Sequence, residues 1–341
     1  MSNADSGSAP RAGARILNEA EVRGLIGPDE ALAAVREAFS RMGRGETMLP
    51  PAMFIWVPEH EGEVHVKGAH VVGAANYAVK FASVFERNPE KGLATVTGMV
   101  LTFSAETGYL SGMLMDNGFL TDLRTGAAGA LAADLLARQD VEQAAVIGAG
   151  IQGRYQLEAL LGVRQPRRVR IFDVNGAAAE AYAAEMSEKT GLTVAVASSV
   201  QEALRGADVV VSTTPAPSPH TMLEWVEPGT HYTAMGSDNP HKQELDAGLL
   251  AAAGKLVVDS REMCAVNGEL HHALDAGLMT IDDVHAELGE VAAGLKPGRT
   301  SDDEITVADL TGLGIQDTAV ADYVMRRAIA AGVGRDLDGL L

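Results

Sequence analysis

Apolar and polar positions change their spacing several times along this chain of 341 residues, and each change marks a different kind of element. Residues 19–23 and 28–41 carry apolar side chains three or four positions apart, which predicts two helices. From residue 52 to residue 116 the apolar residues form short runs separated by turn-forming residues, which is typical of β-strands with short connections in a largely antiparallel sheet. The five expected strands are residues 53–56, 63–67, 77–84, 95–104 and 109–116.

Helical spacing returns at residues 120–136, where alanine and leucine dominate. Beyond them, short buried apolar runs alternate with helical segments, which predicts a doubly wound parallel sheet. The expected strands are residues 141–147, 168–172, 193–197, 209–212, 231–234, 256–259 and 305–310, and a last helix covers residues 316–331. We therefore expect an α/β protein with a Rossmann-type doubly wound parallel sheet and a smaller α+β domain.

The domain boundaries are expected where the pattern changes. Residues 1–14 are rich in serine, glycine and alanine and lack the apolar core of a signal peptide, so they are expected to form a flexible tail. Residues 15–119 and 313–341 are assigned to the smaller domain, and residues 120–312 to the Rossmann domain.

A glycine-rich turn lies between a predicted strand and a predicted helix. Gly148, Gly150 and Gly153 have the G-x-G-x-x-G spacing of dinucleotide-binding turns. The first permits a tight turn, the second lets a pyrophosphate approach bare backbone, and the third lets the helix pack against the strand. The helix start at Ile151 and Gln152 would present unpaired N–H groups to the phosphates. The alternative is an unoccupied strand–helix turn.

Asp173 ends the next predicted strand about 20 residues later, where dinucleotide-binding folds place an acid that binds the ribose 2′-hydroxyl. Such an acid would repel the 2′-phosphate of NADP, so the expected cofactor is NAD. Thr213 and Thr214 follow another strand and are candidates for ribose contacts, although hydroxyl groups at such places also satisfy turns by themselves.

Two lysines of the smaller domain are candidates for binding an anion. Lys80 stands between two apolar residues on a predicted strand, and it either points inward to a carboxylate or lies at a solvated edge. Lys67 shares one strand face with His65, because side chains two positions apart point the same way. That polar face either lines a site or is a solvated outer face opposite two valines.

Two further stretches carry candidate chemistry. Arg124 and Thr125 lie near the start of an Ala-rich helix, where a cation is unfavourable unless it serves an anion; a plain surface arginine is the alternative. Asp238 and Lys242 follow a predicted parallel strand, at the edge where α/β sheets bind ligands. Asp238 could exchange protons, or it could simply cap a helix. Residues 309–312 follow the last strand and are expected at the same edge.

Composition excludes several classes of protein. The 27 Lys and Arg against 46 Asp and Glu give a net charge of −19, so the chain lacks the basic balance of proteins that bind nucleic acid or anionic membranes. The single cysteine, Cys264, excludes an intrachain disulfide and favours a reducing, cytoplasmic location. No apolar run reaches the roughly 18 residues of a membrane-spanning helix. The histidines do not have metal-binding spacing, so no metal is expected.

Taken together, these stretches resemble the ornithine cyclodeaminase/μ-crystallin family. The strings at residues 58–60, 62–67 and 235–238 look closest to the branch associated with ectoine utilisation. The strings that carry the family resemblance, in the family's order within residues 15–330, are Val79-Lys80, Leu120 to Thr125, Gly148 to Gln152, Gly236 to Asp238 with Lys242 to Leu245, and Asp309 to Gly312.

The resemblance implies a homodimer built through the smaller domain, NAD(H) in the Rossmann domain, and a site between the domains for an amino acid or its imine. By the family pattern, Lys80 and Arg124 would bind the substrate carboxylate. Asp238 would transfer a proton near the nicotinamide, with Lys80 as the second catalytic candidate. Further cofactor contacts are expected from Arg124, Thr125, Met235, Gly236, Ser237 and Lys242.

One departure concerns the arginine that the family usually places after a Gln/Pro-Pro segment. Here Pro51 is followed by Ala52, Met53 and Phe54, which cannot form the bidentate pair of a guanidinium with a carboxylate. This puts ornithine in doubt as the substrate, and Lys67 or His65 is the candidate replacement.

The expected function is an NAD-dependent oxidoreductase or cyclodeaminase acting on the C–N bond of a small amino acid or its imine. The missing arginine and the ectoine-like strings favour imine reduction or a related step on a diamino acid such as diaminobutyrate, and amino acid dehydrogenation uses the same residues. The alternative is a non-catalytic μ-crystallin-like protein that binds a dinucleotide and a small ligand.

Overall fold

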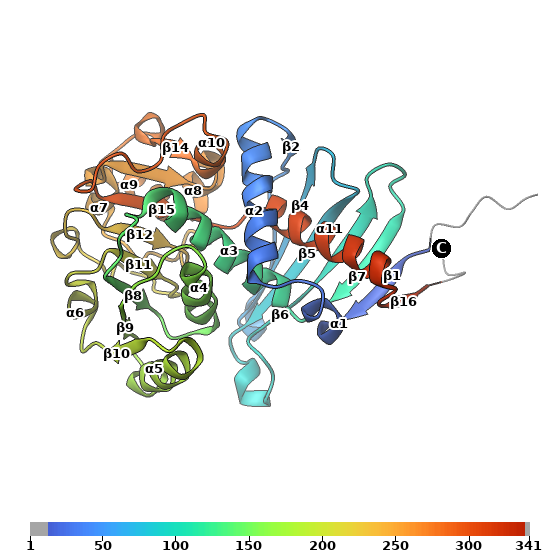
Figure 1. Ribbon diagram of the computed structural model, residues 1–341, viewed down its shortest axis with the longest axis horizontal. Coiled ribbons are helices and arrows are strands. Elements are labelled where there is room, and N and C mark those ends of the chain that lie inside the picture. The colour runs from blue at the N-terminus through green and yellow to red at the C-terminus, as the bar shows by residue number, and fades with distance from the viewer. Residues whose placement is uncertain (1–12, 338–341) are drawn as a thin grey trace, which may run out of the picture. The chain divides into compact units, whose positions relative to one another are not determined.

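The computed structural model describes residues 13–337, so most of the expected tail lies outside the described residues. The chain divides into two compact units (Figure 1). The first comprises the chain up to Gly27, Thr47–Thr121 and the chain from Asp317 onward; the second comprises Pro28–Glu46 and Asp122–Gln316.

The first unit is built on a mainly antiparallel sheet, which has eight strands within the described residues. Its order is β16-β1-β7-β6-β5-β4-β2, with β3 paired to β4, and the pairing of β1 with β7 is parallel. The strands are β1 (Arg15–Asn18), β2 (Thr47–Met48), β3 (Met53–Val57), β4 (Gly62–Val71), β5 (Asn76–Phe85), β6 (Val96–Ser104), β7 (Leu110–Met115) and β16 (Arg335–Asp336).

Two helices complete the first unit: α1 (Glu19–Arg23) and most of α11 (Gly314–Ala331). Helix α11 lies along one face of the sheet (Figure 1). Its side chains reach strands about 245 positions away, since Asp322 accepts the backbone N–H of Asn76 at 3.0 Å and Thr318 donates to the carbonyl of Ala69 at 2.8 Å. The end of the Met325 side chain fills the space where a side chain at Gly112 would lie, so α11 packs directly on strand β7.

The second unit contains the predicted doubly wound sheet. Its order within the described residues is β10-β9-β8-β11-β12-β15-β13-β14, and every pairing is parallel. The strands are β8 (Gln143–Ile147), β9 (Arg168–Phe172), β10 (Thr193–Val196), β11 (Val209–Ser212), β12 (His231–Ala234), β13 (Lys255–Val258), β14 (Ala286–Glu287) and β15 (Thr306–Asp309).

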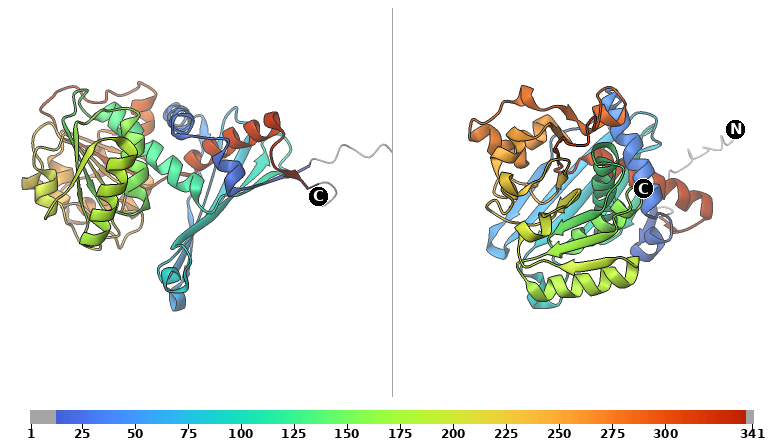
Figure 2. Two further views of the ribbon diagram at one scale, coloured as in Figure 1. Left: turned by 60° about the horizontal axis from the view of Figure 1, so that its bottom comes forward. Right: turned by 60° about the vertical axis from the view of Figure 1, so that its left-hand side comes forward.

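Helices lie on both faces of this sheet (Figures 1 and 2), as the near-continuous apolar strands require. One core joins the sheet to α3 (Phe119–Leu136), α4 (Ile151–Leu161) and α5 (Gly176–Thr190). The core on the other face joins it to α6 (Val200–Leu204), α7 (Ala247–Ala252), α8 (Arg261–Asn267) and α9 (Glu269–Asp275). Within residues 13–337, no helix is long and apolar enough to cross a membrane.

Helix α2 (Pro28–Gly43) is grouped with the second unit, although residues 15–119 were expected to form the smaller domain. Its partner is α10 (Leu288–Ala292), and the two backbones meet where Gly43 lies against Gly289. A side chain at Gly43 would overlap the Gly289 carbonyl, so this contact requires glycine. The sequence predicted the amphipathic helix correctly, but amphipathicity does not say which surface the apolar face meets.

Candidate functional site

A pocket of ≈ 620 Å³ opens beside strands β8 and β11 of the parallel sheet. From β8 the chain adds β9 and β10 on one side and then returns to place β11 on the other, so this is the topological switch point where such sheets bind ligands. Five of the predicted cofactor residues line the pocket: Gly148, Gly150, Asp173, Thr213 and Thr214. Its remaining wall includes the segment from Pro215 to His220.

The glycine loop has the geometry that its spacing predicted. Gly148 has a φ of +105°, and a Cβ there would lie 2.8 Å from the Thr213 hydroxyl. A Cβ at Gly153 would overlap the Gly148 carbonyl, so this glycine lets α4 pack closely on the turn. Gly150 caps α4 in an extended conformation, with no atom within 4 Å of a Cβ position. The open space at Gly150 and the half-exposed Ile151 fit a pyrophosphate at the helix start.

Asp173 lies just beyond the end of β9, and its carboxylate holds the glycine loop. One oxygen accepts the N–H of Ala149 at 2.8 Å and the other accepts the N–H of Asn175 at 2.7 Å. Gln152 points elsewhere: its amide donates to Asp122 at 2.7 Å and thereby ties α4 to α3. The acid and the loop therefore fit the adenosine half of a dinucleotide, whereas the Gln152 side chain has a structural partner.

The turn after β12 carries the predicted proton-transfer residue. Asp238 and Lys242 form an ion pair at 2.7 Å, and both side chains are partly exposed. Met235 donates its N–H to Ser212 at 3.0 Å, and the buried Ser237 donates its hydroxyl to the carbonyl of Lys242 at 2.7 Å. The cap of the next helix, α7, is Asp246, so the helix-capping alternative for Asp238 is wrong.

Arg124 is not the surface arginine of the alternative interpretation, because it is 5% exposed. Its guanidinium donates to the Gln316 side chain at 3.1 Å, and a Cβ at Gly312 would lie 2.6 Å from it. The neighbouring Thr125 accepts the amide of Gln156 at 2.9 Å through its carbonyl, which joins α3 to α4. The predicted stretches at residues 124–125 and 309–312 therefore meet within the second unit.

In the first unit, Lys80 and Lys67 lie in register on the paired strands β4 and β5. Lys80 is 2% exposed and Lys67 is 6% exposed, so the solvated alternatives for both are wrong. His65 is also buried, and its ring lies 3.2 Å from Glu63 and edge-on to Phe54. The ammonium of Lys80 pairs at 3.3 Å with Asp317, which is as buried as the lysine. The polar face of β4 therefore points inward.

Three buried acids to which the sequence assigned no individual role are further functional candidates. Asp317 is the counter-ion of Lys80, and Glu244 and Glu269 lie behind the pocket. Burial, reinforced by neighbouring carboxyl groups, raises the pKa of Glu269 to about 9 and that of Asp309 to about 7. No sequence spacing signals these positions, because their partners are distant in the chain.

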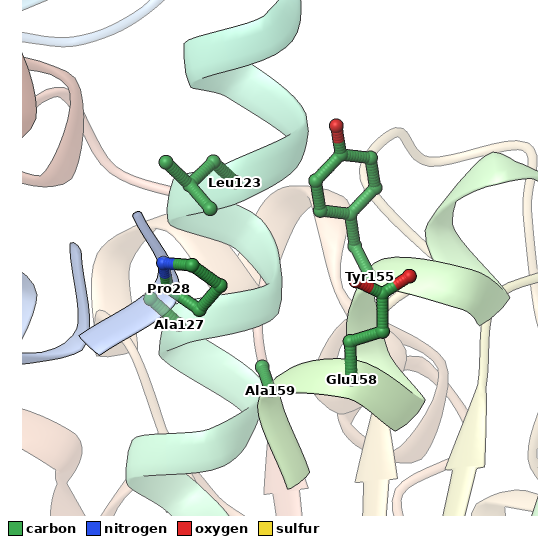
Figure 3. A pocket seen from close by; sticks show the side chains of 6 residues that line it. All are labelled: Pro28, Leu123, Ala127, Tyr155, Glu158 and Ala159. Atoms are coloured by element: carbon green, nitrogen blue, oxygen red, sulfur yellow. The ribbon is translucent and has the colours of Figure 1, made fainter. Parts of the chain in front are cut away.

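A second hollow, shown in Figure 3, lies where Pro28, at the start of α2, approaches α3 and α4. At ≈ 20 Å³ it has room for about one water molecule and contains none of the predicted site residues. Its lining is Pro28, Leu123, Ala127, Tyr155, Glu158 and Ala159. Within residues 13–337, no group of three or more His, Cys, Asp or Glu side chains could hold a metal ion.

The model of the ornithine cyclodeaminase/mu-crystallin family matches residues 14–332, which is nearly the whole chain. The chain belongs to this family.

Three solved structures are similar to it over almost their entire length. An archaeal alanine dehydrogenase dimer with bound NAD has a TM-score of 0.90 at 40% identity, covering 96% of this chain and 100% of its own. A Δ1-pyrroline-2-carboxylate reductase of Thermococcus litoralis, in complex with NADH and L-proline, has a TM-score of 0.90 at 32% identity and covers 94% and 99%. The iminosuccinate reductase of Paracoccus denitrificans, in complex with NAD⁺, has a TM-score of 0.88 at 32% identity and covers 96% and 99%.

Within the ornithine cyclodeaminase/mu-crystallin family, this chain differs where an arginine was expected after Pro51. Met53, two positions later, is 53% exposed and pairs with Val66 across β3 and β4. Lys67, the next residue of β4, lies on the buried face, as does His65. Strand β4, which pairs with the strand that begins at Met53, therefore carries the buried side chains of His65 and Lys67.

Proposed function

We propose that this protein is an NAD-dependent enzyme that acts on the C–N bond of a small amino acid or its imine, with imine reduction as its main direction. The observation that carries this proposal is the convergence of the glycine loop, Asp173 and Thr213-Thr214 on one pocket at the switch point of the sheet. The family and the similar structures with NAD, NADH or NAD⁺ support the same cofactor.

NAD(H) supplies or accepts the hydride when it is bound. In the reductive direction, the carbon of the C=N bond gains that hydride, the nitrogen gains a proton, and the products are the amine and NAD⁺. Asp238 is the proposed proton donor to nitrogen, because its partly exposed carboxyl group lies on the turn after β12, at the edge where parallel sheets bind ligands. Lys242 holds that carboxyl group in place through the 2.7 Å ion pair.

Lys80 and Lys67 of the first unit are proposed to bind the substrate carboxylate, and a role of Arg124 in binding it stays a prediction from the family resemblance. All three cations are buried. The attraction between a cation and a carboxylate is stronger in such a buried environment than in water. Lys80 is proposed as the second catalytic residue, because it fixes the carbon next to the carboxylate relative to the hydride. Positioning of this kind contributes a large part of many enzymatic rate enhancements.

The substrate is proposed to be a small imino acid. The similar proteins are named for alanine, pyrroline-2-carboxylate and iminosuccinate. In each of these compounds, a nitrogen is bonded to the carbon next to a carboxylate. In the cyclodeaminase alternative, the hydride is returned to a cyclised imine, ammonia is lost and no net redox change occurs. A role in the use of ectoine or diaminobutyrate stays a prediction from the strings at residues 58–60, 62–67 and 235–238.

A substrate panel distinguishes these outcomes. It should combine pyruvate with ammonia, cyclic imines, ornithine, lysine and 2,4-diaminobutyrate, with NADH absorbance and ammonia followed together. Oxidation of NADH with an imino acid supports the reductase, and ammonia release without net NADH change supports the cyclodeaminase. Tight NADH binding without turnover of any compound would overturn both and identify a μ-crystallin-like binding protein.

A further inference from the structure

Behind the pocket, a single buried carboxylate joins the loops that follow β11 and β12. Glu244 is completely buried, and one of its oxygens accepts the N–H of Thr214 at 2.7 Å and the hydroxyl of Thr214 at 2.8 Å. Its other oxygen accepts the hydroxyl of Ser212 at 2.8 Å and the N–H of Gly236 at 2.8 Å. Glu244 therefore connects the Thr214 wall of the pocket to the start of the turn that carries Asp238.

The hydrogen bonds that Glu244 accepts from Ser212, Thr214 and Gly236, called the Glu244 bracket below, restrict the loops that follow β11 and β12. A side chain at Gly236 would overlap the Thr214 carbonyl and would lie 2.6 Å from the carboxyl carbon of Glu244. A buried carboxylate without hydrogen-bond donors costs several kcal/mol, so the folded chain must keep these donors around Glu244. The loops are consequently fixed to one another through Glu244 as well as through the neighbouring strands.

Glu244 is itself held from behind. Its backbone N–H donates to Glu269 at 2.7 Å, and the N–H of Leu245 donates to the other oxygen of Glu269 at 3.0 Å. Its carbonyl accepts the N–H groups of His220 and Thr221, at the end of the proline-rich wall of the pocket. Supporting hydrogen bonds of this kind lock the orientation of a side chain that shapes a site.

We propose that Glu244 is a positioning residue for the dinucleotide, which sets the wall at Thr214 and the turn at Gly236 before the cofactor arrives. The inference rests on the proposed function, because it takes the pocket as the dinucleotide site. A preformed pocket binds more tightly because fewer groups must be ordered on binding. Loss of the Glu244 bracket should therefore raise the Kd for NADH in a protein that still folds.

The test is Glu244→Gln, measured by NADH fluorescence titration together with thermal unfolding. The amide keeps the size of the side chain but turns one oxygen into an N–H donor that faces two other donors. The expected result is a Kd for NADH at least about tenfold higher than in the wild type, with a KM for NADH that rises in parallel.

The matched control is Asp208→Asn at the opposite edge of the same sheet. Asp208 is also buried and accepts the N–H groups of Glu142 at 2.6 Å and Gln143 at 3.0 Å, next to Arg138. The Asp208→Asn substitution should lower the melting temperature, while the Kd for NADH stays within about twofold of the wild-type value. Equal changes in Kd for the two variants, or an unchanged Kd for Glu244→Gln, would overturn the proposal.

If Glu244→Gln does not fold, Ser212→Ala takes its place, because it removes one donor from the bracket and keeps the carboxylate. The expected result is then a smaller rise of the Kd, of about two- to fivefold, and a wild-type Kd would overturn the proposal. Failure of the proposed catalysis is seen separately, as NADH binding by the wild type without turnover, and it leaves the role of Glu244 standing. A wild type that does not bind NADH would overturn both.

Discussion

Two carboxylates hold the loops of the pocket in place: Asp173 accepts the N–H of Ala149 in the glycine loop, and Glu244 accepts the N–H groups of Thr214 and Gly236. Asp173 could be predicted because its distance from the glycine loop is fixed by one strand and one helix. Glu244 could not, because its donors at residues 212, 214 and 236 are set by the packing of separate strands. A sequence motif predicts contacts between residues that are close in the chain. The hydrogen bonds of Glu244 instead depend on how separate strands of the sheet pack together.

Asp173→Ser should weaken the preference for NADH over NADPH. The wild-type carboxylate repels a 2′-phosphate, so the expected ratio of kcat/KM for NADH to that for NADPH is at least about 100 in the wild type and about tenfold lower in the variant. Glu180→Ser, on the exposed side of α5, removes the same charge nearby and should leave the ratio unchanged. Equal or better use of NADPH by the wild type contradicts the assignment.

Asp238→Asn should retain NADH binding and lose most turnover. The amide cannot donate a proton as a carboxylic acid does, and the loss of a general acid typically lowers kcat by about 10²- to 10⁴-fold. Asp246→Asn is the control, because Asp246 lies eight positions later and caps α7. Steady-state kinetics with the best imine of the panel provide the measurement, and near-normal kcat in Asp238→Asn would refute the assigned role.

At the scale of elements, the strand pattern predicted the sheet of the first unit but not its buried face. Apolar residues usually mark the inner face, yet His65 and Lys67 lie on the inner face of β4 while two valines are only partly buried. Helix α11 contributes to this burial, because its Asp317 pairs with Lys80, which lies opposite Lys67 on the neighbouring strand β5. Asp317 and Lys80 are more than 230 positions apart in the chain. Alternation within a strand cannot reveal a counter-ion that a distant helix supplies.

Helix α3 illustrates the same point at its start. The helix begins at Phe119, and the carboxylate of Asp116, three positions earlier, accepts the N–H of Leu120 at 2.7 Å. Asp116 is buried, and its second oxygen has no hydrogen-bond partner within the described structure. Burial raises the pKa of Asp116 from 3.8 to about 6, although the backbone N–H groups of the helix start oppose the shift.

Asp116→Asn should change the pH dependence of stability. The folded state keeps the Asp116 proton between pH 3.8 and about 6, where the unfolded chain releases it, so its stabilising contribution is complete below pH 3.8 and is lost as the pH rises through 6. Asparagine keeps an acceptor for Leu120 and does not ionise. The free energy of unfolding of the variant, measured in urea, should therefore rise relative to the wild type by on the order of 1–3 kcal/mol between pH 4 and 7.

The control for this pH series is Asp134→Asn, whose difference in unfolding free energy from the wild type should vary little between pH 4 and 7, because the pKa of Asp134 is lowered from 3.8. Burial alone would raise the pKa of Asp134, but the guanidinium groups of Arg164 and Arg36 outweigh it and lower the pKa. The stabilising contribution of Asp134 is therefore present at neutral pH and is lost as the pH falls through its lowered pKa. A difference between Asp116→Asn and the wild type that does not vary with pH would contradict the role of Asp116.

At the scale of the whole molecule, we expect a homodimer. Met53, Ile55 and Trp56 of β3 are each about half exposed, and such an apolar group on a strand is typical of a surface that a partner covers. The similar archaeal alanine dehydrogenase was solved as a dimer. Light scattering at micromolar concentration should give twice the chain mass of 35.6 kDa. Trp56→Lys should shift the mass toward one chain, whereas the exposed Leu295→Lys should not; a monomeric wild type counts against the proposal.

The contact between Gly43 and Gly289 has a consequence for protein engineering. The second unit is not one continuous stretch of chain, because it includes residues 28–46, whose helix α2 packs backbone to backbone on α10. A chimera that exchanged only residues 122–316 with a relative would place the host α2 against a foreign α10. Recombination therefore has to transfer both segments together, or keep glycine at positions 43 and 289, for the grafted unit to close its surface.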